Sequence, residues 1–83
     1  MFVVALTYTA PLARIDAFLE AHRAFLAEQY GRGLFLMSGR KEPRDGGIIV
    51  AHAASRAELD SVLRDDPFHQ AGVARYEIVE FVP

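Results

Sequence analysis

Proton chemistry is the reaction type that the residues of this chain suggest first. His22 lies among apolar residues spaced three and four apart, as on one face of a helix, so its imidazole is expected to face a sheet rather than water. A buried imidazole needs a partner, because burying an unsatisfied polar group costs about 1 to 3 kcal/mol. Ser38, at the end of a predicted strand, and Asp66, in an Asp-Pro-Phe turn, are the candidate partners.

A carboxylate bound to one ring nitrogen would fix the tautomer of His22 and leave the other nitrogen as a general base near neutral pH. His22, Asp66 and Ser38 are therefore the candidate catalytic residues. Two alternatives stay open. His22 could be a core histidine bonded to a backbone carbonyl or a serine, which its position alone favours, and Asp66 could be a turn former that accepts from backbone amides. A Ser–His–Asp hydrolase is weakly indicated, since no nucleophile-elbow pattern surrounds Ser38.

Metals and cofactors are not expected. His52 and His69 do not stand three or four residues from another histidine or glutamate in a way that suggests a metal set. The six glycines fall at the ends of predicted elements and match no phosphate-binding pattern. The absence of cysteine excludes disulfides and thiolate chemistry, and it favours a reducing cytoplasm.

The charge pattern argues against nucleic acid. The chain has a net charge of −2, whereas a phosphate backbone calls for a basic face. The basic cluster Arg40, Lys41 and Arg44 is interleaved with Glu42 and Asp45, so we interpret it as a solvated turn rather than an anion site. The apolar start of the chain is too short for a membrane span and lacks a basic residue, so neither a span nor a signal peptide is expected.

The elements that must position these residues follow the order β-α-β-β-α-β. Alternating apolar residues predict strands over residues 2–8, 34–38, 48–53 and 73–82. A helix is predicted from 11 to about 31 or 33, and a second follows the N-cap Ser55, with Glu58 at the capping-box spacing, and stops at Pro67. Residues 40–47 are predicted to be a loop and 65–68 a turn.

With right-handed crossovers, this order gives a single α+β domain over residues 1–83: a ferredoxin-like, four-stranded antiparallel sheet with two helices on one face. The other face has no helix of its own. A hydrophobic share of 52% is more than so short a chain can bury alone, so a second copy is expected to cover that face.

Five segments together resemble the YciI-like (YCII-related) family of the dimeric α+β barrel superfamily over nearly the whole chain. They are HRAFL at 22–26, LMSG at 36–39, GGIIV at 46–50, DPF at 66–68 with Gly72 after it, and YEI at 76–78. The Asp-Pro-Phe segment is the most specific. Arg40 stands where the family often has proline after Ser-Gly.

The resemblance implies a protomer that pairs sheet to sheet into a homodimer, with a helix–sheet pocket for a small molecule and no cofactor. It also implies a His–Asp dyad, which maps onto His22 and Asp66, with Ser38 as a helper near the pocket. One type of member eliminates chloride from a chlorinated hydroxyquinol derivative.

The leading hypothesis is therefore a small cofactor-independent enzyme, lyase- or isomerase-like, acting on a cyclic or aromatic metabolite through His22 and Asp66. The alternative is a non-catalytic binding or accessory module that uses the same pocket. A cofactor-free, oxygen-dependent monooxygenase is a third hypothesis, supported by fold analogy alone.

Overall fold

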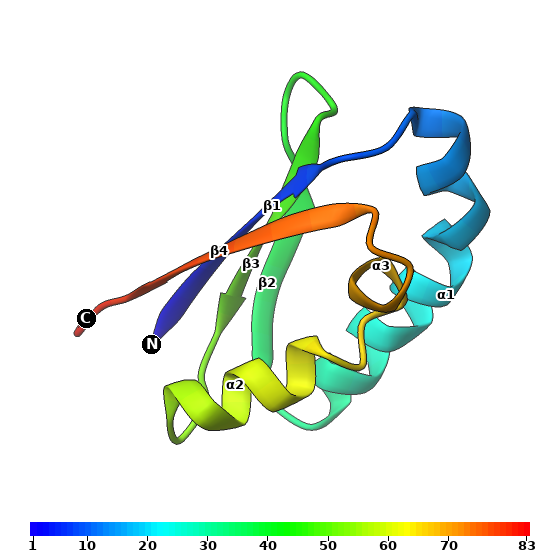
Figure 1. Ribbon diagram of the computed structural model, residues 1–83. Coiled ribbons are helices and arrows are strands. Elements are labelled where there is room, and N and C mark those ends of the chain that lie inside the picture. The colour runs from blue at the N-terminus through cyan, green and yellow to red at the C-terminus, as the bar shows by residue number, and fades with distance from the viewer.

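The computed structural model describes all residues, 1–83, as one sheet with helices packed on one of its faces (Figure 1). The elements are β1 (Phe2–Tyr8), α1 (Leu12–Gly31), β2 (Phe35–Arg40), β3 (Gly46–Ala51), α2 (Arg56–Leu63), α3 (Pro67–Gln70) and β4 (Ala74–Glu80). The strands pair antiparallel in the order β2-β3-β1-β4. The predicted α+β, ferredoxin-like fold is confirmed.

The hairpin between β2 and β3 is tighter than predicted. β2 extends to Arg40 and β3 begins at Gly46, so both strands run into the predicted 40–47 loop. Glycine at 46 is needed for close approach rather than for a turn, since a Cβ there would lie 1.8 Å from the carbonyl oxygen of Leu6 on β1. β3 also ends two residues early, at Ala51.

The predicted turn at 65–68 continues into a one-turn helix, α3, so three helical segments back the sheet instead of two. Asp66 is its N-cap and its carboxylate accepts from the Phe68 amide, while Pro67 occupies the start of the helix, where no amide hydrogen is required. Four residues are too few to show a helical period, which is why the pattern indicated only a turn.

The core lies between the helices and the inner face of the sheet. α1 contributes Ile15 and Phe25 to it, together with the buried polar residues His22 and Gln29. Leu12, in the first turn of α1, is exposed, so the buried stripe of this helix begins at Ile15. The predicted cap of α2 is confirmed, as the Ser55 side chain accepts from the Glu58 amide at 3.1 Å.

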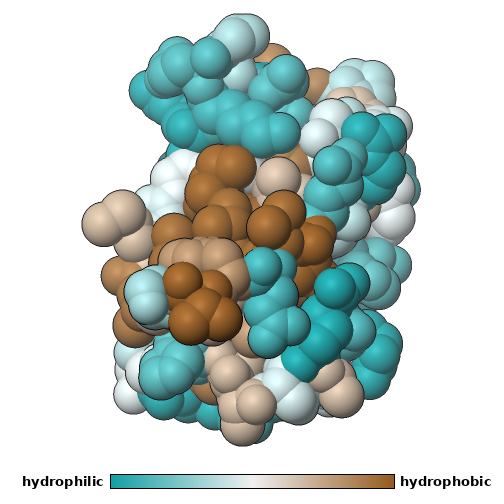
Figure 2. Space-filling model, turned by 90° about the vertical axis from the view of Figure 1, so that its left-hand side faces the viewer, coloured by the Kyte–Doolittle hydropathy of each residue, from teal (hydrophilic) through white to brown (hydrophobic).

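The outer face of the sheet has no helix over it, and Figure 2 shows apolar side chains gathered in the middle of this side. Met37, Val50, Val3 and Val79 are direct cross-strand neighbours and form an apolar row across all four strands. The two ends of this row, Met37 and Val79, are 68% and 62% exposed. None of the helices is both long and apolar enough to span a membrane.

Candidate active site

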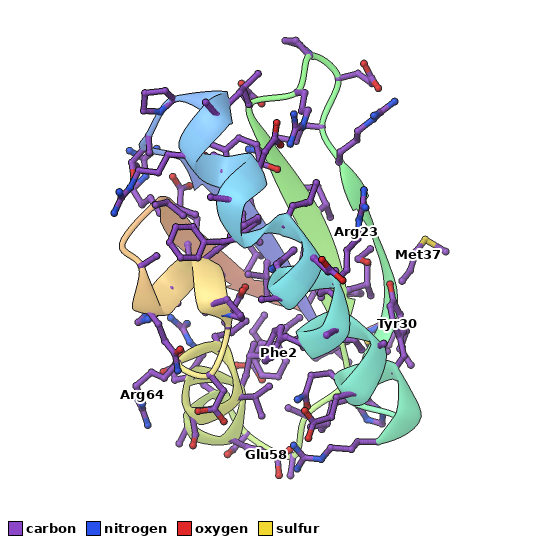
Figure 3. All side chains as sticks on the ribbon, turned by 90° about the vertical axis from the view of Figure 1, so that its right-hand side faces the viewer. Phe2, Arg23, Tyr30, Met37, Glu58 and Arg64 are labelled. Atoms are coloured by element: carbon purple, nitrogen blue, oxygen red, sulfur yellow. The ribbon has the colours of Figure 1, made fainter.

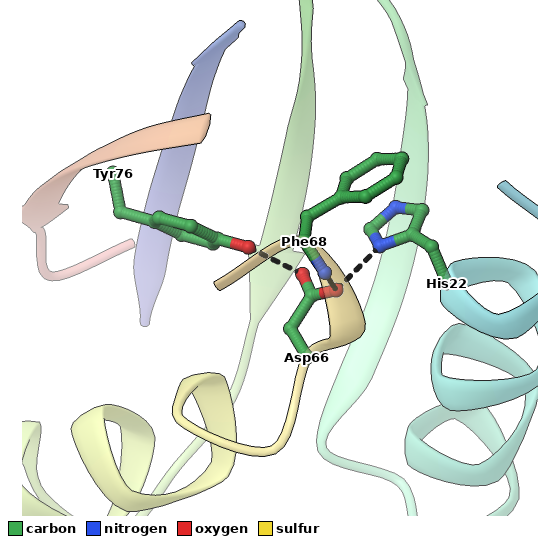
Figure 4. Close-up of polar contacts among 4 residues, drawn as sticks. All are labelled: His22, Asp66, Phe68 and Tyr76. Carbon is green, nitrogen blue, oxygen red and sulfur yellow. Dashed lines mark hydrogen bonds and ion pairs between the residues drawn. The ribbon is translucent and has the colours of Figure 1, made fainter. Parts of the chain in front are cut away.

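The structure brings His22 and Asp66 into direct contact. His22 is on the inward face of α1 and Asp66 is at the start of α3, 44 residues later, and His22 Nδ1 lies 2.7 Å from Asp66 Oδ1 (Figure 4). Both residues are buried, Asp66 completely. His22 is therefore bonded to a carboxylate rather than to a backbone carbonyl or to Ser38.

Asp66 accepts three hydrogen bonds. Oδ1 accepts from His22 Nδ1 and from the Phe68 amide at 3.0 Å, and Oδ2 accepts from the Tyr76 hydroxyl at 2.6 Å. The interpretation of Asp66 as a residue that accepts from backbone amides is thus confirmed, but it is incomplete, because the same carboxylate that caps α3 also binds His22. Three donors offset much of the cost of burying a carboxylate.

These contacts fix both the tautomer and the plane of the His22 ring. A carboxylate only accepts, so Nδ1 carries a proton, and in the neutral imidazole the lone pair is therefore on Nε2. The ring stacks on Phe68, with centroids 4.0 Å apart and planes 10° from parallel. Nε2 makes no hydrogen bond within the chain, and His22 lines a cavity, so this nitrogen is available to a molecule bound there.

Tyr76 on β4 is the member of this group that the sequence interpretation missed. Burial and then the nearby Asp66 carboxylate raise the pKa of the Tyr76 phenol far above its ordinary value, so the hydroxyl stays a neutral donor. The alternation of β4 was the available signal, because it places Tyr76 on the helix side, where a buried phenol needs an acceptor.

The cavity lies between α1 and the β2–β3 hairpin and has a volume of about 530 Å³, enough for a one-ring molecule. Its apolar wall is formed by Leu6, Leu19, Leu26, Ile49 and Phe68. His22 is part of the same lining, so its imidazole has an apolar wall on one side and the Asp66 carboxylate on the other.

Ser38 lines the cavity but makes no hydrogen bond to His22. Its hydroxyl shares a short hydrogen bond with the hydroxyl of Tyr30. The structure therefore forms no Ser–His–Asp hydrogen-bond chain. His69 packs beside Tyr76, with ring centroids 5.3 Å apart, and no three His, Asp or Glu side chains are grouped to hold a metal ion.

The predicted solvated turn is only partly solvated. Arg44 is half-buried and donates to Asp16 on α1, and both Arg40 and Arg44 line the cavity. Only Lys41 stays apart from the cavity, donating to Thr7 at 3.3 Å. A local charge pattern could not reveal this arrangement, because it depends on the hairpin folding back against α1.

Comparison with known proteins agrees with this fold. The family model of the YCII-related domain matches residues 1–82. No curated protein matches the chain in sequence. Among solved structures, the chain is similar to 5-chloro-2-hydroxyhydroquinone dehydrochlorinase (TftG) from Burkholderia phenoliruptrix AC1100 in complex with 2,5-dihydroxybenzoquinone. The TM-score is 0.77 and the identity 21%, over 99% of this chain and 94% of the other.

Proposed function

This chain belongs to the family of YCII-related domains, and on that basis we propose that it is a small cofactor-independent enzyme in which His22 transfers a proton on a cyclic or aromatic substrate. The proposal rests on one observation: the 2.7 Å contact between His22 Nδ1 and Asp66 Oδ1, made at the wall of a cavity of about 530 Å³. The fold shared with TftG, a dehydrochlorinase solved with a one-ring quinone, supports it.

In the proposed reaction, His22 Nε2 takes a proton from a C–H or O–H group of the substrate. The electron pair of the broken bond forms a new π bond, and the imidazolium is stabilised by the Asp66 carboxylate at Nδ1. In an elimination from an aromatic ring, the imidazolium first returns the proton to the ring carbon that bears the leaving group, and a second O–H deprotonation then expels the leaving group with its bonding pair. In an isomerisation, His22 returns the proton to another substrate atom. Acid–base catalysis of this kind contributes typically about 10²- to 10⁴-fold in rate.

We assign Ser38 a supporting role. Its hydroxyl is in the cavity lining and is already held by Tyr30, so it can present a lone pair or a proton to an oxygen of the substrate.

We also propose a homodimer paired through the outer sheet face, because a row of apolar side chains lies uncovered there. The cytoplasmic location stays a prediction.

The test of the acid–base proposal uses two probes from the TftG complex and reaction. Chloride release from 5-chloro-2-hydroxyhydroquinone, and deuterium incorporation into 2,5-dihydroxybenzoquinone in D₂O, both report proton transfer at carbon. We expect His22→Gln and Asp66→Asn to lower either rate by about 10²- to 10⁴-fold. His52→Gln is the matched control, since His52 is exposed and outside the cavity lining, and it should keep the full rate.

The same experiment separates catalysis from binding alone. If a probe binds the wild-type protein but neither reacts nor exchanges, the enzyme proposal is wrong and the non-catalytic binding module is favoured. If neither probe binds, the assignment of the cavity to one-ring molecules is wrong as well. Imidazole ¹⁵N NMR adds a readout for Asp66, since the Nδ1–H tautomer should be present in the wild-type protein and lost in Asp66→Asn.

A further inference from the structure

Positive charge gathers around the cavity beside His22. Three arginines, Arg23, Arg40 and Arg44, line it, and Asp16 is the single acidic residue of the lining. The lining thus carries three positive charges and one negative charge, and it remains net positive when the Asp66 carboxylate behind His22 is counted, whereas the whole chain has a net charge of −2. A concave site with low-dielectric walls concentrates such a field, so the cavity attracts anions although the protein is slightly acidic.

Arg23 has unused binding capacity. It follows His22 directly on α1, its side chain is exposed, and it makes no ion pair or side-chain hydrogen bond within the chain. Figure 3 shows it on the flank of α1 that borders β2 and β3. A guanidinium is always charged and has five N–H donors, which suit the paired oxygens of a carboxylate.

Arg44 is held in place and Arg40 is not. The bond from Arg44 to Asp16 ties the hairpin loop to α1, and the donors of Arg44 that Asp16 does not use remain beside the cavity. Arg40 Nε lies 3.3 Å from a Glu42 oxygen, but the two side chains are 71% and 79% exposed. Exposed pairs of this kind are weak, so Arg40 is free to turn toward a ligand.

We propose that the occupant of the cavity is a small organic anion: a one-ring molecule with a carboxylate or an ionised hydroxyl group. The ring packs on the apolar wall at Leu19 and Phe68, and the anionic oxygens bind Arg23 and Arg44. This inference rests on the proposed function and names its substrate class. Arginines at this site also suit the proposed proton transfer. Proton removal by His22 builds negative charge on the substrate, and the guanidinium groups stabilise that charge.

Benzoate and benzamide test the proposal, because they share a ring and differ in charge. By calorimetry at low salt, benzoate should bind roughly tenfold more tightly than benzamide, and the difference should shrink when salt screens the charges. Arg23→Gln and Arg44→Gln should each weaken benzoate binding by about five- to tenfold and leave benzamide unchanged. The control is Arg64→Gln, because Arg64 is also exposed and without an ion pair but lies away from the cavity (Figure 3).

Equal affinities for benzoate and benzamide, or an Arg64→Gln effect equal to that of Arg23→Gln, would overturn the proposal. If inorganic phosphate bound the cavity as tightly as benzoate does, the claim that the occupant is an organic, ring-containing anion would be wrong. The variant His22→Gln distinguishes the anion-binding proposal from the proposed function. It should still bind benzoate more tightly than benzamide, but it should no longer transfer a proton. A wild-type protein with the preference but without proton transfer contradicts the enzyme proposal alone.

Discussion

At the scale of single residues, Asp66 joins three parts of the molecule through one buried carboxylate. It holds His22 on α1, the amide of Phe68 on α3 and the hydroxyl of Tyr76 on β4. Removing one donor leaves the others in place but reduces the compensation for the buried carboxylate. Substitutions at these positions are therefore expected to affect both the orientation of His22 and the stability of the fold.

Tyr76 gives the stability of the protein a dependence on alkaline pH. Burial, and then Asp66, raise the pKa of this phenol well above its unfolded value of 10.0. Above pH 10 the unfolded chain therefore loses a proton that the folded protein keeps, and the free energy of unfolding falls by up to about 1.4 kcal/mol per pH unit. Below pH 10 the contribution is complete. Denaturant unfolding measured from pH 8 to 11 should show this fall in the wild-type protein and a smaller one in Tyr76→Phe.

The matched control is Tyr30→Phe, which also removes a phenol hydroxyl, but from an exposed side chain bonded to Ser38. It should follow the wild-type pH dependence. Parallel curves for the wild-type protein and Tyr76→Phe would contradict the assignment of the alkaline effect to Tyr76.

At the scale of the elements, the short helix α3 orients the site. Its N-cap is Asp66, and its side chain Phe68 stacks on His22 and meets Tyr8 of β1 edge-on, with ring centroids 5.9 Å apart. One turn of helix thus sets both the hydrogen-bond partner and the stacking partner of the imidazole. The opposite wall of the cavity belongs to the β2–β3 hairpin, whose position depends on how closely β3 can approach β1.

Gly46 tests that approach. A Cβ at this position would lie 1.8 Å from the Leu6 carbonyl oxygen, and a backbone atom cannot turn away as a side chain can. Gly46→Ala is therefore expected to push β3 from β1 and to lower the free energy of unfolding by about 1 to 3 kcal/mol or more. Gly31→Ala is the control, since no atom lies within 4 Å of a Cβ there, and α1 should lose no stability. Equal stability of the two variants in denaturant unfolding would show that the strands tolerate a side chain at 46.

At the scale of the whole molecule, the outer sheet face predicts a homodimer. Met37 and Val79 end the apolar row across this face, and both are more than half exposed in the single chain. Met37→Glu and Val79→Glu place a charge in the proposed interface and should shift the protein to monomer at micromolar concentration, as measured by sedimentation equilibrium. Leu12→Glu, a change of the same kind at an exposed residue on α1, should leave the dimer intact. A monomeric wild-type protein would contradict the proposed dimer.

The sequence by itself determined the elements and their faces. Periods of two and of three to four residues predicted the four strands, the two longer helices and the inward position of His22, because these properties depend on neighbours along the chain. Ser55 was predicted as an N-cap for the same reason. The element order then allowed few arrangements, of which the ferredoxin-like sheet is the one observed.

Only the tertiary structure decided which residues on different helices and strands are in contact. His22 and Asp66 are 44 residues apart in sequence and 2.7 Å apart at their nearest atoms, a contact that no local pattern encodes. The hydrogen bond from the Tyr76 hydroxyl to Asp66 likewise depends on how β4 packs beside α3. The bond from Arg44 to Asp16 depends on how the β2–β3 hairpin packs against α1. These distances are set by how the helices and strands pack on one another. They can therefore be measured in the folded molecule but cannot be derived from the order of its residues.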